Sequence, residues 1–325
     1  MKFRLPLQSP VIQDPISYSD RLLLIGSCFT EHIFERLNAL KFRVMQNPHG
    51  IMFNPQSIAT ALRACIEKRS YTANDLVYIN EAWHSWQHHS IFSHPDCMQA
   101  AQKMTESSHA AHAFLQQADW AMLTLGSAFV YELVETGTAV ANCHRAPAQY
   151  FRRRLLGIDE CIILLRETFQ MLLHFRPTLR FVLTISPVRH LREGFIDNSR
   201  SKATLVHAVH TILAEFKQAH YFPAYELVLD DLRDYRFFAE DMVHPNYLAT
   251  QYVWEQFAQT CLSSETQKQV SIIEKLLTAR RHRPFNPQSD AHRRFLSSHL
   301  EHTLQLQRQM PDLDWNEELQ YFATN

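Results

Sequence analysis

Short apolar runs alternate along the chain with longer segments in which apolar residues recur every three or four positions. The short runs predict buried strands, and the longer periodic segments predict amphipathic helices. The predicted strands are residues 21–26, 42–46, 120–125, 129–133, 180–185 and 226–230. The predicted helices are residues 29–40, 54–68, 96–117, 159–175, 199–218 and 247–260. This alternation predicts an α/β fold with a mostly parallel sheet and helices on both faces.

Small and polar residues follow four of the predicted strands. In a doubly wound sheet the carboxyl ends of parallel strands meet at one edge, where ligands bind. We therefore predict five parallel strands in the order 2-1-3-4-5, with one shared pocket at this edge. The residues expected to open on that pocket are Cys28, Gly50, Ser127, Ser186 and His244.

The sequence changes character from about residue 262. A basic run at residues 280–283 and two prolines, Pro284 and Pro287, precede a helical pattern over residues 290–309. We predict a main domain over residues 1–261 and a C-terminal helical appendage over residues 262–325. The basic run is expected to be a solvated helix end, although an anionic partner is an alternative.

Composition narrows the functional classes. Apolar residues make up 46% and charged residues 20% of 325 residues, which is typical of a globular protein. The net charge of −1 gives no electrostatic case for binding nucleic acid or an anionic membrane. No apolar run approaches the roughly 18 residues of a membrane span, and the first residues lack a signal-peptide pattern, so a cytoplasmic protein is expected. Six cysteines without metal-type spacing predict reduced thiols.

The end of the first predicted strand carries a hydroxyl and a thiol. Gly26 supplies a tight turn, and Ser27 and Cys28 then precede a predicted helix. A helix N-terminus favours a thiolate or a developing oxyanion. Cys28 is therefore a candidate nucleophile whose pKa we expect to be lowered, with Ser27 as the alternative.

A carboxylate and an imidazole lie three residues apart near the end of the main domain. Asp241 can orient His244 and fix its tautomer, and Pro245 restricts the backbone of His244. An early nucleophile and a late Asp/His pair follow the logic of a catalytic triad.

Six separated motifs resemble the bacterial GSCFA-domain family over roughly residues 3–260. They are Gly26-Ser27-Cys28-Phe29, Asn47-Pro48-His49-Gly50 with Phe53-Asn54-Pro55, Trp83-His84-Ser85 with His89-Ser90, Asn142-Cys143-His144-Arg145, Ser186-Pro187-Val188-Arg189-His190 and Asp241-x-x-His244-Pro245. Thr30 stands where the family name has alanine. This family is similar to the SGNH/GDSL hydrolases, which implies a flavodoxin-like three-layer α/β/α fold with esterase or acyltransferase activity.

The hydrolase resemblance carries over by position. The nucleophilic serine corresponds to Cys28, with Ser27 at the aspartate position, and the Asp-x-x-His block corresponds to Asp241 and His244. The second-block glycine, an oxyanion donor, corresponds to Gly50. The third-block asparagine is missing from Gly126-Ser127-Ala128-Phe129, and Asn142 is a replacement for it.

The remaining motif residues are expected to bind substrate or an oxyanion: Asn47, His89, Ser127, His144, Ser186, Arg189 and His190. Arg189 and His190 suit a carboxylate or phosphate, although Arg189 could instead pair with Glu193 or Asp197. The histidines at 84, 88, 89 and 94 lack ligand spacing, so no metal is expected.

The sequence thus predicts an SGNH-like esterase or acyltransferase that forms an acyl-enzyme on Cys28 or Ser27. Its substrate would be a small acylated molecule or glycan, with no cofactor and with acyl-coenzyme A as a donor in the case of transfer. The alternative is a non-catalytic module that binds a small anionic or glycan ligand through Arg189, His190 and Lys202. A metal-dependent hydrolase would require the histidine-rich segment to converge on one point.

Overall fold

The central sheet has five parallel strands. A computed structural model describes residues 5–324, apart from the side chain of Glu193. The strands are β1 (Arg21–Gly26), β2 (Arg43–Gln46), β5 (Trp120–Leu125), β9 (Arg180–Ile185) and β10 (Ala219–Tyr221). They lie in the order β10-β9-β5-β1-β2, and every neighbouring pair is parallel. Numbered along the chain, this is the predicted order 2-1-3-4-5.

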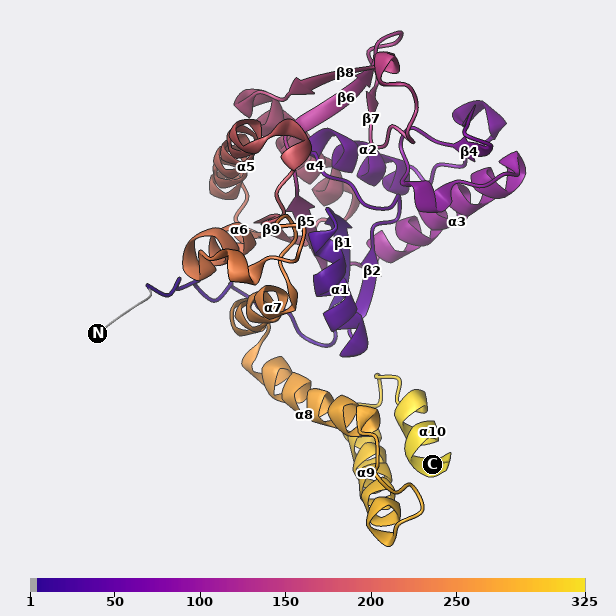
Figure 1. Cartoon of the computed structure of the whole chain (residues 1–325), viewed down its shortest axis with the longest axis vertical. Helices are drawn as coiled ribbons and strands as arrows, with labels where there is room; N and C mark the ends of the chain where they lie inside the picture. The colour runs from indigo at the N-terminus through magenta and orange to yellow at the C-terminus, as the bar shows by residue number, and fades with distance from the viewer. Residues whose placement is uncertain (1–4, 325) are drawn as a thin grey trace.

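Helices cover both faces of the sheet (Figure 1). Successive residues of β1 alternate between two cores: Leu22 and Leu24 belong to one, Leu23 and Ile25 to the other. Burial on both faces explains why the strands read as continuous apolar runs. The first core also holds α1 (Phe29–Ala39) and α7 (Tyr247–Cys261). The second holds α2 (Pro55–Ile66), α3 (Cys97–Leu115), α4 (Ile158–Phe175) and α5 (Phe195–Glu215). The fold is therefore the predicted three-layer α/β/α arrangement.

The strand predicted at residues 226–230 is wrong. This segment lies in α6 (Ala224–Glu226) and in a π-helical turn, Leu227–Leu232. The edge of the sheet is taken by β10, where Ala219 pairs with Phe181 of β9. Leu227 and Val228 are adjacent in sequence and both are buried in the first core, a pattern that a helical turn satisfies and an edge strand does not.

Two small antiparallel sheets lie outside the central sheet. The predicted strand β6 (Phe129–Leu133) pairs with β7 (Ala139–Val140) and β8 (Phe151–Leu155), and β3 (Val77–Ile79) pairs with β4 (Ala82–His84). In Figure 1 the β6–β8 sheet lies beyond α2 and α4, and its residues line part of the candidate cavity.

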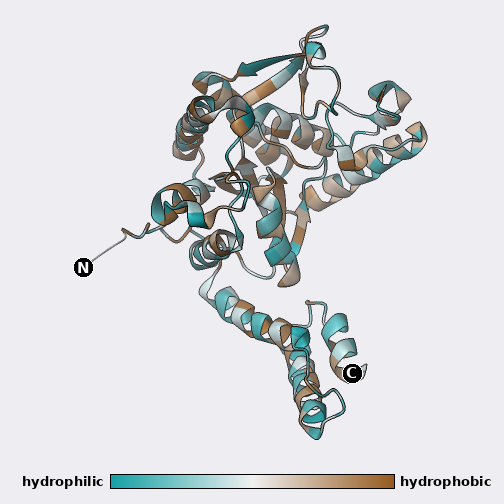
Figure 2. Cartoon of the chain, viewed as in Figure 1, coloured by the Kyte–Doolittle hydropathy of each residue, from teal (hydrophilic) through white to brown (hydrophobic). Residues whose placement is uncertain are grey.

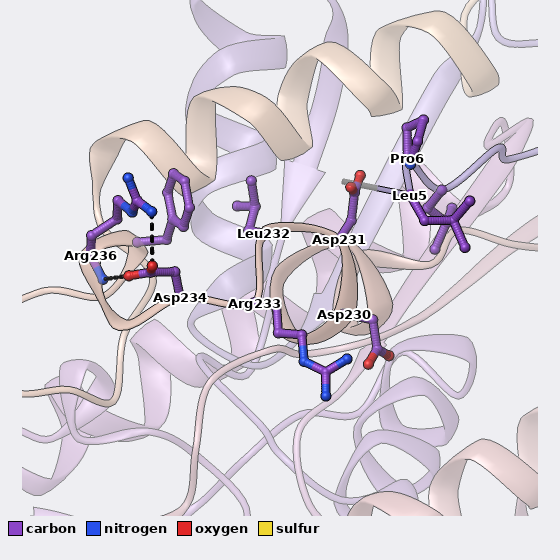
Figure 3. Close-up of a pocket in the computed structure, with 10 residues that line it drawn as sticks. Leu5, Pro6, Asp230, Asp231, Leu232, Arg233, Asp234 and Arg236 are labelled. Carbon is purple, nitrogen blue, oxygen red and sulfur yellow. Dashed lines mark hydrogen bonds and ion pairs between the residues drawn. The ribbon is translucent and has the colours of Figure 1, made fainter. Parts of the chain in front are cut away.

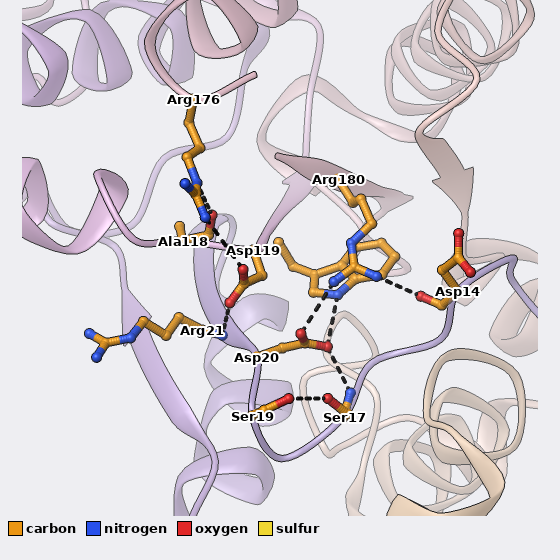
Figure 4. A network of polar contacts seen from close by, with 10 residues as sticks. Asp14, Ser17, Ser19, Asp20, Arg21, Ala118, Asp119, Arg176 and Arg180 are labelled. Atoms are coloured by element: carbon orange, nitrogen blue, oxygen red, sulfur yellow. Dashed lines mark hydrogen bonds and ion pairs between the residues drawn. The ribbon is translucent and has the colours of Figure 1, made fainter. Parts of the chain in front are cut away.

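Carboxylates tie the strands together at the edge away from the site (Figure 4). The Asp119 carboxylate accepts the backbone N–H of Arg21 at the start of β1. Asp20 forms an ion pair with Arg180 at the start of β9 and accepts the indole N–H of Trp120 at the start of β5. Charged residues at this edge therefore set the register of three strands.

Three further helices follow the sheet domain: α8 (Ser264–Arg281), α9 (Asp290–Gln309) and α10 (Asn316–Thr324). They extend away from the sheet and are richer in hydrophilic residues than the central strands (Figures 1 and 2). Buried apolar residues of this region, including Leu276 of α8 and Trp315 just before α10, nevertheless belong to the same core as α1 and α7. Among the described residues, no helix is both long and apolar enough to cross a membrane.

Candidate active site

The turn after β1 requires glycine. Gly26 has φ +147°, and a Cβ there would lie 2.2 Å from the carbonyl oxygen of Thr124 on the neighbouring strand. The chain then enters α1, with Cys28 as the N-cap residue. As expected, the thiol lies at a helix N-terminus, and it is half-buried.

The expected lowering of the Cys28 pKa is wrong. Burial, and then the nearby Glu31 carboxylate, raise the pKa of Cys28. The backbone N–H groups of Phe29 and Cys28 and the charge of Lys202 act in the opposite direction but are outweighed. Desolvation therefore prevails over the helix N-terminus at this thiol.

Ser27, which precedes Cys28 in the turn, is buried in the protein interior. Its side chain is fully buried, and its hydroxyl has no hydrogen-bond partner among residues 5–324. A substrate cannot reach this hydroxyl in the observed conformation, whereas Cys28 is partly accessible. Accessibility thus favours Cys28 over Ser27.

Asp241 and His244 form the predicted pair. Oδ2 of Asp241 lies 2.6 Å from Nδ1 of His244, and Oδ1 accepts the backbone N–H groups of Val243 and His244. These donated hydrogen bonds lower the pKa of Asp241 to about 2. Because an ionised carboxylate can only accept, Nδ1 of His244 carries the proton and Nε2 is the basic nitrogen. No hydrogen bond joins His244 to Cys28 within the described residues.

Arg189 holds the loop that carries this pair. Its backbone N–H donates to the carbonyl of Val243, and its guanidinium donates to the carbonyl of Met242. The guanidinium carbon lies 4.0 Å from the centre of the Phe238 ring. Arg189 is therefore engaged with its own chain rather than directed at a ligand.

The predicted alternative, an ion pair of Arg189, gains no support. Asp197 pairs instead with Arg200, and the side chain of Glu193 lies outside the described part of the chain.

Lys202 is also internal. Its Nζ donates to the carbonyl oxygens of Gly126 and Ser186, both at 2.6 Å, and thereby joins the ends of β5 and β9. The side chain is fully buried, and burial lowers the pKa of Lys202 to about 7. Ser186 is buried as well, and its hydroxyl accepts the backbone N–H of Val188. Both side chains are buried and engaged within the protein, so the structure lends no support to the predicted roles of Lys202 and Ser186 in ligand binding.

A cavity of about 510 Å³ brings together five of the predicted residues. They are Ser127, His89, Asn142, His144 and His190. The other lining residues are Ile51, Phe53, Asn54, Phe129, Tyr131, Val140, Ala141, Cys143, Arg145, Ala146, Ala148, Phe151 and Arg192. Cys28, Gly50, Ser186 and His244 are not among them, so the single shared pocket that we predicted is only partly formed.

His190 connects this cavity to the nucleophile turn. A Cβ at Gly126 would lie 3.1 Å from Nε2 of His190 and 3.2 Å from Cβ of Ser27. Burial, and then the charges of Lys202 and His244, lower the pKa of His190 to about 3. His190 is therefore a neutral imidazole between the cavity, Ser27 and the Asp241–His244 loop.

The loop that follows β2 is hydrogen-bonded to the turn that follows β1. Oδ1 of Asn47 accepts the backbone N–H of Gly26 at 2.8 Å. Gly50 has φ +83°, and a Cβ there would lie 2.1 Å from Cβ of His89, so glycine is required. The N–H of Gly50 donates to the carbonyl of Asn47 at 2.7 Å. This donor is occupied, so the structure lends no support to its predicted role in an oxyanion hole.

Several cavity residues escaped the sequence analysis. Cys143 and Arg145 lie within a motif that we identified, and Arg192 lies two residues after His190. Their closeness in sequence to predicted site residues could have marked them as candidates. The aromatic residues Phe129 and Phe151 come from the small antiparallel sheet, whose pairing no local pattern reveals.

The histidine-rich segment is packed rather than convergent. His49 and His88 stack with ring centres 4.1 Å apart, and Nδ1 and Nε2 of His84 contact Ser93 and the carbonyl of Ile79. Within the described residues, no three histidine, cysteine, aspartate or glutamate side chains are grouped to hold a metal ion.

A larger cavity of about 800 Å³ lies elsewhere (Figure 3). It is lined by Leu5, Pro6 and Leu7, by residues 230–234, and by Arg236 and Phe237; Asp234 forms an ion pair with Arg236. None of the predicted site residues lines it.

Comparison of the sequence with protein-family models agrees with the resemblance that the motifs suggest. The GSCFA family model matches residues 21–257, and a second model, the C-terminal domain of GSCFA domain proteins, matches residues 273–325. The chain belongs to the GSCFA family. No curated protein matches this GSCFA sequence.

Solved structures with some likeness to this GSCFA protein include three esterases. A carbohydrate esterase family 3 protein from Talaromyces cellulolyticus is 9% identical with a TM-score of 0.34, covering 79% of this chain and 99% of its own. A family 3 carbohydrate esterase from Clostridium thermocellum is 8% identical with a TM-score of 0.35, covering 79% and 98%. An acetyl xylan esterase from Butyrivibrio proteoclasticus is 12% identical with a TM-score of 0.37, covering 82% and 66%. Likenesses this distant carry no information on substrate or mechanism.

Proposed function

We propose that this GSCFA protein cleaves or transfers acyl groups from small esters through an acyl-enzyme on Cys28. The observation that carries the proposal is the 2.6 Å contact between Asp241 and Nδ1 of His244. It fixes the imidazole with Nε2 as the base, which a thiol of raised pKa requires. The influence of His244 extends to His32 on α1 and to His190, two residues close to the Cys28 turn.

The chemistry follows from these roles. Nε2 of His244 takes the thiol proton as Sγ of Cys28 bonds to the ester carbonyl carbon. The tetrahedral intermediate then breaks its bond to the leaving oxygen, which receives the proton from His244. Water or an acceptor alcohol, deprotonated by the same nitrogen, attacks the resulting thioester and releases Cys28. Asp241 stays ionised throughout and stabilises the imidazolium.

Negative charge on the carbonyl oxygen requires donors at the helix N-terminus. The first N–H groups of a helix lack intrahelical partners, so the N–H of Cys28 is the suitable donor. Asn142, which lines the cavity, is the proposed side-chain donor in place of the asparagine missing after β5. This mechanism uses no cofactor, and acyl-coenzyme A is the proposed donor in the case of transfer.

A second function, a non-catalytic binding module, is favoured by two observations. The pKa of Cys28 is raised, and the N–H of Gly50 is already engaged. In that case the cavity would bind a small ligand without reacting with it.

Intact-protein mass spectrometry tests the proposal. The protein is mixed with 4-nitrophenyl acetate or acetyl-coenzyme A and quenched in acid. We expect an adduct of one acetyl group that is absent from Cys28→Ala and retained in Ser27→Ala. Loss of the adduct in Ser27→Ala alone would transfer the nucleophile role to Ser27. Absence of any adduct, together with absence of turnover, would favour the binding module.

A further inference from the structure

The cavity beside His190 is cationic. Arg145 and Arg192 line it, and among the described side chains no aspartate or glutamate does. Neither guanidinium forms an ion pair with any side chain that the structure describes. Unpaired arginines in a pocket without carboxylates favour an anionic ligand, because a guanidinium donates two parallel hydrogen bonds to a carboxylate or phosphate.

The backbone turn that carries Arg145 is anchored, and the side chain of Arg192 contacts an aromatic ring, although both arginines are exposed. Arg145 follows His144 in a turn in which both residues have positive φ, +57° and +48°. Oδ1 of Asn142 accepts the N–H of His144, and Nε2 of His144 lies 2.8 Å from the carbonyl of Ser85, so the turn is anchored. The guanidinium of Arg192 lies over the Tyr131 ring, 5.4 Å from its centre.

The positive charge of the cavity comes from the arginines. Burial lowers the pKa of His89, that of His144 to about 4 and that of His190 to about 3. These imidazoles are neutral near pH 7, whereas the guanidinium groups stay charged at every physiological pH. Anion binding here should therefore change little between pH 6.5 and pH 8.5.

The cavity also has an apolar part, which is formed by aromatic side chains. Phe53, Phe129 and Phe151 line the same cavity. Phe53 also packs edge-on against His190, with ring centres 5.1 Å apart, and so lies on the side facing the nucleophile turn. The cavity thus offers an apolar wall on the side of His190 and two cations for a charged group.

We infer that the substrate is an anionic ester or thioester, whose carboxylate or phosphate is bound by Arg145 and Arg192 while an apolar portion packs on the phenylalanines. This inference rests on the proposed acyl-transfer function for its reactive group. The anion site itself stands on the cavity and its charges.

Two matched substrate pairs distinguish the sources of the charge. Mono-4-nitrophenyl glutarate carries a carboxylate on its acyl group, and 4-nitrophenyl pentanoate is a neutral counterpart. Acetyl-coenzyme A carries phosphates on its leaving group, and S-acetyl-N-acetylcysteamine is the neutral counterpart. Turnover is measured for wild type, Arg145→Gln and Arg192→Gln, with Arg63→Gln as control, an exposed arginine on α2 outside the cavity.

We expect kcat/KM to favour the anionic member of at least one pair by about tenfold or more. Each cavity variant should remove most of that preference by raising KM, with little effect on the neutral esters and none from Arg63→Gln. The preferred pair identifies the carboxylate or the phosphate. Equal turnover of both members in both pairs would overturn the inference and leave the proposed function standing.

Binding without turnover separates the two proposals. Titration calorimetry with glutarate and with coenzyme A measures the anion site directly. Arginine-dependent binding without any turnover would support the anion site and contradict the esterase proposal. Binding that the two cavity variants leave unchanged would overturn the site.

Discussion

The thiol of Cys28 is subject to opposing influences from its neighbours. Burial and the carboxylate of Glu31 raise its pKa, and the ammonium of Lys202 lowers it. Lys202 is affected in turn, since Cys28 raises the pKa that burial depresses. A buried lysine whose hydrogen bonds go only to carbonyl oxygens is costly to charge, and the charge states of Lys202 and Cys28 are coupled.

Two substitutions should therefore change Cys28 reactivity in opposite directions. Glu31→Gln removes a negative charge, lowers the pKa of Cys28 and should speed its alkylation by iodoacetamide at pH 8. Lys202→Met removes the positive charge and should slow alkylation by up to about tenfold, the effect of one pKa unit; this rate is compared at pH 6.5, where a lysine with a pKa of about 7 is mostly protonated. The rates are measured by mass spectrometry of tryptic peptides.

Matched controls exclude general effects of these substitutions. Glu35→Gln lies one turn further along α1, and Lys217→Met is exposed beyond α5. Both should alkylate as wild type does. If Glu31→Gln and Lys202→Met change the rate in the same direction, a structural disturbance is acting and the electrostatic account fails.

At the scale of elements, the loop after β2 packs against the histidine-rich segment. The rings of His49 and His88 are stacked and buried, and Tyr71 meets both edge-on. The N–H of His89 donates to the carbonyl of His49. This contact places His89 over Gly50 at the cavity, so the stack supports the site.

The stack should make folding stability depend on pH. Burial lowers the pKa of His49 to about 4 and that of His88 well below its ordinary value. Between pH 6.5 and pH 4 the unfolded chain binds more protons than the folded chain, so stability falls as pH falls through this window. For His49 the loss is at most about 3 kcal/mol at 1.36 kcal/mol per pKa unit.

Urea unfolding at pH 7.5 and pH 5.0 measures this loss. His49→Leu should reduce the difference in unfolding free energy between the two pH values. His302→Leu, at an exposed position on α9, should not. An unchanged difference in His49→Leu would show that other groups cause the acid sensitivity.

Elements were more predictable than the site. The order of the parallel strands follows from apolar runs alternating with helical patterns, because burial on both faces leaves a clear signal. Residues 226–230 also form a short apolar run, but they lie largely in a π-helical turn. A short apolar run alone therefore does not distinguish a strand from a helix. Arg145 and Arg192 share a cavity only because a small antiparallel sheet and a loop after β9 meet there, and tertiary contacts of that kind leave no local pattern.

At the scale of the whole molecule, the two family-model regions share one hydrophobic core. Leu37 of α1, Phe257 of α7, Leu276 of α8 and Trp315 belong to the same buried cluster. The domain boundary that we predict at residue 261 remains a prediction, and the core runs across it.

Polar contacts reinforce this junction. Nζ of Lys41 lies 2.8 Å from a carboxylate oxygen of Glu318, which is buried, and Arg280 reaches the other oxygen at 3.0 Å. Lys41 also lies over the Trp315 ring, 5.3 Å from its centre. The C-terminal helices are therefore fixed to the residues that follow α1 rather than loosely tethered.

Trp315→Ala should release this junction. The indole is almost fully buried, and a large aromatic residue replaced by alanine in a core costs about 3–5 kcal/mol. Phe285→Ala, in the same C-terminal region but fully exposed, should change the unfolding free energy by less than about 0.5 kcal/mol. Urea unfolding followed by circular dichroism measures both. If the C-terminal helices fold independently, Trp315→Ala would leave the main transition unchanged; because the core is shared, we expect one transition at lower urea concentration.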